Sequence, residues 1–329
     1  MHHRASVPLL ILLALLLAVP ARPASAFSVL AHQAVIDRSW DDVIVPALRD
    51  RFPAASADEI EQARAFAYGG SHVPDLGYFP FGSRLFTDLL HYVHSGEFVS
   101  TLLADAGTVQ EYAFALGAAS HYVADTIGHS EATNRVVPEL DPDLRAEHGD
   151  VVTYADAPAA HMSTEFRFDV LQLAQSRQSP DLFRHAIEFE IAEPLLDRAF
   201  RETYGLSLED VFVSTDVAIT TYRWGFRELL QEATGVAWQL YQADIQRIDP
   251  AATAESFVSN MSREDFEKQF GDSYREAGYF ARAFAWIVKL VPEVGPLESL
   301  PYKALPQDAQ DRFRTALDDV LREYRAVVK

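Results

Sequence analysis

The chain has 329 residues, a formal net charge of −20 at pH 7 and no cysteine. Without cysteine no disulfide bond can stabilise the fold, and the acidic excess leaves no broad basic surface for nucleic acid or an anionic membrane. Bound divalent cations would offset part of this charge locally, and they could supply the stabilisation that disulfides cannot give here.

The first 26 residues have the pattern of an export signal. Arg4 precedes an apolar run from Leu9 to Val19, and Ala24-Ser25-Ala26 fits the small-residue A-x-A cleavage pattern. This run is too short to span a bilayer as a stable helix, and no later segment reaches about 18 consecutive apolar residues. We therefore predict a signal peptide over residues 1–26, a mature chain that begins at Phe27, and a secreted or periplasmic protein.

Helical periodicity runs along nearly all of the remaining chain. Apolar residues recur at three- and four-residue intervals from Glu111 to Gly128, from Val213 to Tyr241 and from Ala309 to Val328. No Asn-Gly or Asp-Gly pair joins two alternating segments into a hairpin. The sequence predicts an all-α fold with a single helical domain over residues 27–329. The Gly and Pro residues gather in two predicted loops, Tyr68–Ser83 and Val136–Asp143.

Histidines concentrate in the first half of the chain, where eight of the 11 fall in the segment His32–His161. In chain order, Asp75 belongs to the Gly/Pro segment "VPDLGY" and His91 to the predicted helix "DLLHYVHSGEF". His72 and His94 lie close by in sequence and compete for any ligand role. Each of these residues is equally consistent with an ordinary role, as a helix-capping aspartate or a core histidine.

The segment "HYVADTIGHS" carries His121, Asp125 and His129 at successive four-residue spacings. On a helix these residues share one face, and the rise per residue separates the outer two by roughly 12 Å. On a straight helix the two histidines therefore cannot bind the same ion, but a carboxylate between them can bridge two ions. Gly128 could break the helix and turn His129 away. A surface helix with two ordinary histidines is the alternative interpretation.

The segment "AAHMSTEFRF" places His161 and Glu165 one helical turn apart. This spacing suits zinc, because an imidazole nitrogen and a carboxylate oxygen then project from one face toward the same point. The same pair also meets by chance and can simply form a hydrogen bond. His148 in "AEHGD" is the alternative to His161; otherwise we expect His148 and His185 to be surface histidines.

Taken together, these motifs resemble the zinc-dependent phospholipase C family. Its helical fold is shared by bacterial phosphatidylcholine-hydrolysing phospholipases C, fungal single-strand nucleases and the N-terminal domain of glycosylphosphatidylinositol-specific phospholipase D. The ordered motifs cover Phe27 to about Phe168. The resemblance implies nine metal-ligand positions, which in this sequence are Phe27, His32, Asp75, His91, His121, Asp125, His129, His161 and Glu165.

The resemblance also implies how the ligands divide among up to three zinc ions. Asp125 would bridge two of the ions. The ligands of the first ion would otherwise be Asp75, His91 and His121; those of the second, His32 and the backbone amino and carbonyl groups of Phe27; and those of the third, His129, His161 and Glu165. Under this scheme the mature N-terminus is itself part of the metal site.

Two departures from the family pattern concern substrate. The phospholipase C and nuclease branches usually begin with Trp, where this chain has Phe27. They also place the next histidine six positions after the helix aspartate, whereas His129 lies four positions after Asp125. The shorter spacing and "VPDLGYF" are more similar to the glycosylphosphatidylinositol phospholipase D branch.

The family resemblance implies a secreted zinc-dependent phosphodiesterase, and phospholipase C-type hydrolysis by metal-activated water is our first hypothesis. Asp75 is the candidate catalytic residue that orients or deprotonates the attacking water. The alternatives are a single-strand nuclease or nucleotidase of the same fold, a glycosylphosphatidylinositol phospholipase D-like enzyme, and a catalytically inactive zinc-binding protein.

The expected partner is a phospholipid or another phosphodiester substrate. The aromatic stretch Gly77–Phe86 lies between two predicted ligands, where it could form an apolar rim for acyl chains, with Arg84 near the phosphate. Such a rim would allow peripheral membrane contact, although a packed loop that shapes the core explains the stretch equally well. The acidic charge argues against a stable nucleic-acid partner.

Overall fold

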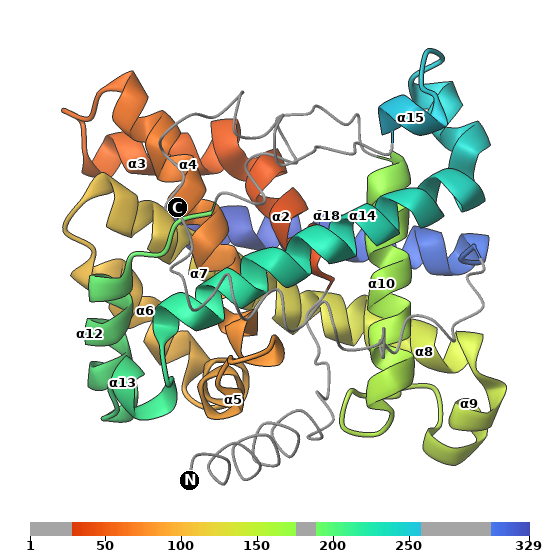
Figure 1. Cartoon of the computed structure of the whole chain (residues 1–329), viewed down its shortest axis with the longest axis horizontal. Coiled ribbons are helices and arrows are strands. Elements are labelled where there is room, and N and C mark those ends of the chain that lie inside the picture. The colour runs from red at the N-terminus through yellow and green to blue at the C-terminus, as the bar shows by residue number, and fades with distance from the viewer. Residues whose placement is uncertain (1–27, 176–188, 258–303) are drawn as a thin grey trace, which may run out of the picture.

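The structure, a computed structural model, describes residues 28–175, 189–257 and 304–329, and these residues form helices without any β-strand (Figure 1). The all-α prediction is confirmed for this part of the chain. Phe27, His185 and the predicted signal peptide lie outside the described residues. Within them, no helix combines the length and apolar character needed to cross a bilayer.

The elements follow one another in a simple order. In the first half they are α2 (Val29–Ser39), η1 (Trp40–Ile44), α3 (Val45–Arg51), α4 (Ala57–His72), η2 (Val73–Tyr78), α5 (Arg84–Tyr92), α6 (Ser95–Asp105), α7 (Val109–Gly128) and η3 (His129–Thr133). After these come α8 (Asn134–Leu140), α9 (Pro142–His148), α10 (Pro158–Gln175), α12 (Glu193–Tyr204), α13 (Leu208–Val211), α14 (Thr215–Ile248), α15 (Ala254–Phe257) and α18 (Gln307–Val328).

Helices α4 and α7 form the close-packed centre of the fold. A Cβ atom added to Gly70 would lie 1.9 Å from the carbonyl oxygen of Phe114, and one added to Gly117 would lie 2.0 Å from that of Ala67. Glycine at both positions therefore allows the two backbones to touch, at the expense of some helix propensity. Since α7 carries the H-x-x-x-D motif and α4 leads into Asp75, this contact sets the spacing across the predicted site.

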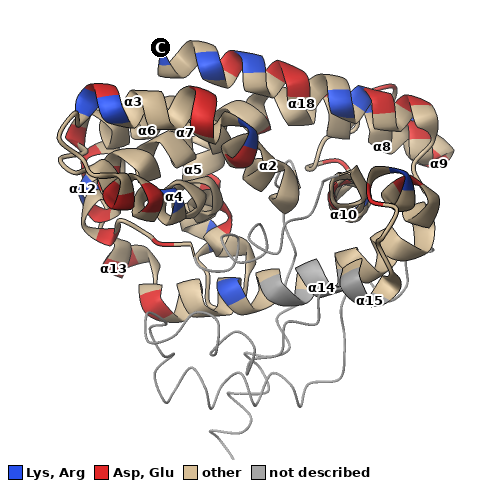
Figure 2. Cartoon of the chain, turned by 90° about the horizontal axis from the view of Figure 1, so that it is seen from above, with Lys and Arg blue, Asp and Glu red and all other residues tan. Residues whose placement is uncertain are grey.

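The other long helices pack around this centre. Figure 2 shows α18 along one side of the molecule and α14 along the opposite side, with α2, α4 and α10 between them. The Tyr324 hydroxyl on α18 donates to the carbonyl oxygen of Leu116 on α7 at 3.0 Å. Phe313 stacks on Phe168 of α10 with ring centroids 4.5 Å apart. The C-terminal helix is thus part of the same core as the motif-bearing helices.

Both predicted loops are wrong in part. The segment from Tyr68 continues α4 as far as His72 and then forms the 3-10 helix η2, because the two glycines serve helix packing rather than a turn. Pro138 lies inside α8, which ends at Leu140. The periodic segment Val213–Tyr241 lies mostly in α14, which has a non-helical φ of −127° at Tyr241 and continues to Ile248.

Candidate metal centre

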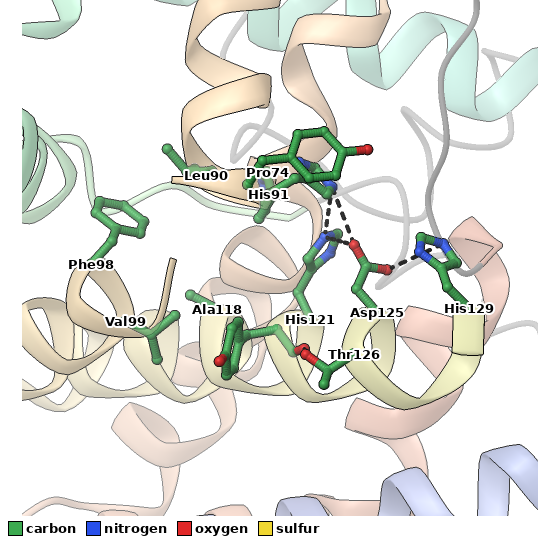
Figure 3. A pocket seen from close by; sticks show the side chains of 12 residues that line it. Pro74, Leu90, His91, Phe98, Val99, Ala118, His121, Asp125, Thr126 and His129 are labelled. Carbon is green, nitrogen blue, oxygen red and sulfur yellow. Dashed lines mark hydrogen bonds and ion pairs between the residues drawn. The ribbon is translucent and has the colours of Figure 1, made fainter. Parts of the chain in front are cut away.

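Eight predicted ligand residues converge from six separate elements. They are His32 on α2, Asp75 on η2, His91 on α5, His121 and Asp125 on α7, His129 on η3, and His161 and Glu165 on α10. The ninth, the Phe27 backbone, lies outside the described residues. Figure 3 shows His91, His121 and His129 gathered around the carboxylate of Asp125.

Asp125 is the centre of the arrangement. Its Oδ1 lies 3.3 Å from Nε2 of His32. Its Oδ2 lies 3.2 Å from Nε2 of His91 and also 3.2 Å from Nε2 of His121. The two carboxylate oxygens therefore face different histidines, which is the arrangement that a carboxylate bridging two cations requires.

Asp75 completes the side of the cluster that includes His91 and His121. Its Oδ1 lies 3.4 Å from Nε2 of His91, and the Nε2 atoms of His91 and His121 are 3.3 Å apart. Two sets of three residues thus bring ligand atoms within 4.8 Å of one another, namely Asp75, His91 and His121, and His32, His121 and Asp125. His121 belongs to both sets, whereas the resemblance assigns it to one ion only.

Backbone carbonyl groups fix the orientation of two of the imidazoles. Nδ1 of His91 donates to the carbonyl oxygen of Thr87, and Nδ1 of His121 donates to that of Ser71, both at 2.8 Å. A carbonyl can only accept, so in the neutral ring the proton lies on Nδ1 and the Nε2 lone pair faces the cluster. Outer partners of this kind orient the histidines that bind metals.

The residues present fit a zinc site. Neither carboxylate oxygen of Asp75 has a hydrogen-bond partner among the described residues, although the side chain is almost completely buried. Buried carboxylates are normally satisfied, and here two imidazole lone pairs also converge beside them. Imidazole nitrogen and carboxylate oxygen are ligand types that zinc prefers, so a cation would satisfy buried oxygens that lack a hydrogen bond within the described part of the protein.

Charges within the cluster shift two pKa values in opposite directions. Burial lowers the pKa of His91, but its ion pairs with Asp125 and Asp75 outweigh burial and raise that pKa to about 10. Burial likewise opposes ionisation of Asp125, yet His121 and His129 hold the pKa of its carboxyl well below the usual range. Without metal, protons on histidine therefore balance the carboxylates.

A second group of ligands lies beyond Asp125. Oε1 of Glu165 is 2.8 Å from Nδ1 of His161 and 3.4 Å from Nε2 of His129. Nε2 of His129 is also 3.8 Å from Oδ1 of Asp125. The structure therefore brings together the three ligands predicted for the third ion, and they lie next to the carboxylate of Asp125.

The predicted break at Gly128 does not occur. Gly128 has helical φ and ψ angles of −61° and −43°, and the chain continues into a π-helical turn at His129. The wider turn carries His129 toward Glu165 while the helix axis continues. A π-turn has no simple sequence signature, so the continued helix could not be expected from the glycine.

The competing histidines lie elsewhere. His72 is completely buried among Phe189, Tyr222 and Phe226, and burial lowers its pKa to about 3. The His94 side chain is 62% exposed beside Glu97. His148 is partly exposed near Asp156 rather than at the cluster.

Two residues that no sequence motif indicates support the site. Oδ1 of Asn134 lies 2.9 Å from Nε2 of His161, so the amide fixes which imidazole nitrogen faces Glu165. Oδ1 of Asp169, one turn beyond Glu165 on α10, accepts from the backbone N–H of Leu30 at 2.8 Å. Asp169 thereby fastens the start of α2, which carries His32, to α10. Neither contact follows from local spacing.

The aromatic stretch is divided between packing and exposure. Phe79 packs against Tyr222, whereas Phe81 and Leu85 are 45% and 54% exposed. The guanidinium of Arg84 lies over the ring of Tyr78, 5.1 Å from its centroid, and pairs with Asp88 at 3.0 Å. Packing against the core is thus observed for Phe79, whereas a role of the exposed side chains as a rim for acyl chains stays a prediction.

Comparison with known proteins gives the family. The profile of the zinc-dependent phospholipase C family matches residues 31–212, which is more than half of the chain. No curated protein and no solved structure matches significantly. The matched region contains every described residue of the cluster, and the chain belongs to the zinc-dependent phospholipase C family.

Proposed function

We propose that this protein is a zinc-dependent phosphoric diester hydrolase that cleaves a phospholipid in the phospholipase C manner. The observation that carries the proposal is the position of Asp125, whose two oxygens face histidines from three different helices. Family membership supports the same reaction class. The proposed ligand sets are those implied by the resemblance, with up to three ions.

The chemistry divides between the metal and the protein. Zinc bound at these residues supplies Lewis acidity toward phosphate oxygens and lowers the pKa of a bound water. Asp125 holds the ligand sets on α2, α5 and α7 in register through its two oxygens. Asp75, at the buried edge of the cluster, accepts the proton of the attacking water at a carboxylate oxygen. Thr87 and Ser71 keep the rings of His91 and His121 aimed at the cluster.

Two parts of this proposal concern location. We propose that residues 1–26 are removed on export and that the Phe27 backbone then joins His32 as a metal ligand. The bond from Leu30 to Asp169 supports this, because it anchors the chain three residues after Phe27 beside the cluster. Intact-mass measurement on exported protein tests the cleavage. Exposed Phe81 and Leu85 support peripheral contact with a lipid surface.

The decisive experiment uses untagged, exported, zinc-loaded protein with phosphatidylcholine, a phosphatidylinositol-type lipid and single-stranded RNA. Phosphorus NMR follows the products, and a chelator control tests metal dependence. We expect a phosphomonoester headgroup from lipid, lost on chelation. His91→Asn should abolish the product, while His94→Asn is the matched control, because His94 is exposed and pairs with Glu97 outside the cluster.

Other outcomes would replace the proposal. Nucleotides without lipid products would indicate a nuclease, and phosphatidic acid would indicate phospholipase D-type cleavage. Absence of product from every substrate, with zinc bound, would indicate a zinc-binding protein without this activity.

A further inference from the structure

The cavity beside the cluster has an apolar end. It has a volume of about 190 Å³, and His91, His121, Asp125 and His129 line one part of it. The opposite part is lined by Leu90, Phe98, Val99 and Ala118 (Figure 3). Along α7, Asp125 and Ala118 are about 10 Å apart. A ligand whose polar group is held at Asp125 therefore meets apolar side chains within that distance.

A second hollow continues from this apolar end. It has a volume of about 580 Å³, lies between α6 and α7, and reaches Val327 near the end of α18. Val99 and Tyr122 line both hollows, so the two adjoin at these side chains. Its remaining lining includes Leu103 and Ala119, and Glu97 is its only charged lining residue among those described.

Gly96 lies beside Tyr122 at the junction. A Cβ atom at this position would lie 3.4 Å from the hydroxyl oxygen of Tyr122, so the phenol lies close over the glycine. Any larger residue at 96 would occupy space beside the junction. Tyr122 itself is 41% exposed, which leaves its ring free of a tight core environment.

We propose that the hollow between α6 and α7 binds an acyl chain of the lipid whose phosphodiester lies at Asp125. The inference rests on the proposed function and adds where the hydrophobic part of the substrate lies. Its basis is that the two hollows adjoin at Val99 and Tyr122, and that apolar side chains, among them Leu103 and Ala119, line part of the second one. The lining offers no cation for the phosphates of a nucleic acid, and the carboxylate of Glu97 repels them.

A chain-length series tests this groove. Dibutanoyl and dihexanoyl phosphatidylcholine are compared as monomers, and kcat/KM should rise with length by up to about fourfold per buried methylene. Ser100→Trp places a large ring in the groove from an exposed lining position. The ratio of kcat/KM for dihexanoyl to that for dibutanoyl phosphatidylcholine should be at least tenfold smaller in this variant than in wild type. Its kcat/KM for dibutanoyl phosphatidylcholine should stay within about twofold of the wild-type value.

Ala104→Trp is the matched control. Ala104 is exposed on the same helix and does not line the groove, so this variant should keep both rates. A Ser100→Trp protein that retains the whole chain-length effect would contradict the proposal that this groove binds an acyl chain.

A second measurement does not depend on turnover. A non-hydrolysable phosphonate analogue of dihexanoyl phosphatidylcholine carries a diazirine at the end of one chain. Photolysis with zinc-loaded wild-type protein should label peptides from α6 and α7, and Ser100→Trp should reduce that labelling at least fivefold. Labelling confined to other segments, such as the exposed Phe81–Leu85 rim, would contradict acyl-chain binding in the groove even if lipid is hydrolysed. Groove labelling without hydrolysis would instead refute the proposed function alone.

Discussion

The two parts of the metal centre are built differently. Around Asp75, His91 and His121, backbone carbonyl groups orient two of the rings, and these side chains are almost completely buried. Around Glu165, a side-chain amide orients His161, and the side chain of His129 remains 21% exposed on a π-turn. Backbone partners cannot change rotamer, so the first group is preformed, whereas the second depends on side chains that can move.

The largest expected effect comes from Asp125→Asn, which acts on the first group and on its link to the second. The amide keeps the shape but loses the charge that faces His32, His91 and His121, so we expect at least two zinc ions to be lost per chain. Activity should fall by at least about 10³-fold, since metal binding supplies several kcal/mol of transition-state stabilisation. Elemental analysis and phosphorus NMR measure both effects. Retention of all the zinc would contradict a bridging carboxylate.

Asp169→Ala tests the anchor that joins the start of α2, which carries His32, to α10 and the second group. The substitution leaves the buried Leu30 N–H at the start of α2 without its acceptor, so the free energy of unfolding should fall by about 1.5–3 kcal/mol. Urea denaturation followed by circular dichroism measures this change. Asp169→Asn is the control, because its amide oxygen can still accept from Leu30 N–H and should preserve more of the stability. Equal stability of Asp169→Ala and wild type would show that the anchor is not needed.

Asn134→Ala tests the side-chain support of the second group alone. Loss of an outer partner typically weakens metal affinity by 10–100-fold, and here the loss should affect one ion per chain. Competition with a zinc chelator, monitored ion by ion, separates the weakened site from the others. Arg135→Ala is the matched control, since that exposed side chain pairs with Glu131. An equal loss of affinity for every zinc ion would show that Asn134 does not support the second group in particular.

Zinc uptake by the first group should release protons. The pKa of His91 is about 10 without metal, so the ring is protonated at pH 7 and must lose a proton to bind zinc. Apparent affinity should therefore rise about tenfold per pH unit from pH 7 until the pH approaches 10. Calorimetry in buffers of different ionisation enthalpy measures the proton count. Binding without proton release would contradict the raised pKa of His91, because a ring that is already neutral has no proton to lose.

Much of the architecture could be predicted, because helical periodicity and four-residue spacing are local signals. They placed His121 and Asp125 on one face of a helix and implied an all-α fold. Glycine misled the prediction at Tyr68–Ser83, because the same residue favours a turn or a close helix contact and local sequence does not distinguish them. Only the position of α7 shows that Gly70 serves packing.

The supporting residues could not be predicted for a different reason. Asn134 lies 27 residues before His161, and Leu30 lies 139 residues before Asp169. A contact between such distant residues depends on how whole helices pack, which no periodicity records. The role of Phe27 stays a prediction, since it rests on the family resemblance.

The glycine contact between α4 and α7 works as a spacer of fixed length. Gly70 and Gly117 bring main chain against main chain, so the gap between the two helices is set by atoms that have no alternative rotamers. Repacking of apolar side chains elsewhere can loosen the core without widening this gap. The spacing between the element that leads into Asp75 and the helix that carries His121 is consequently determined by two missing methyl groups.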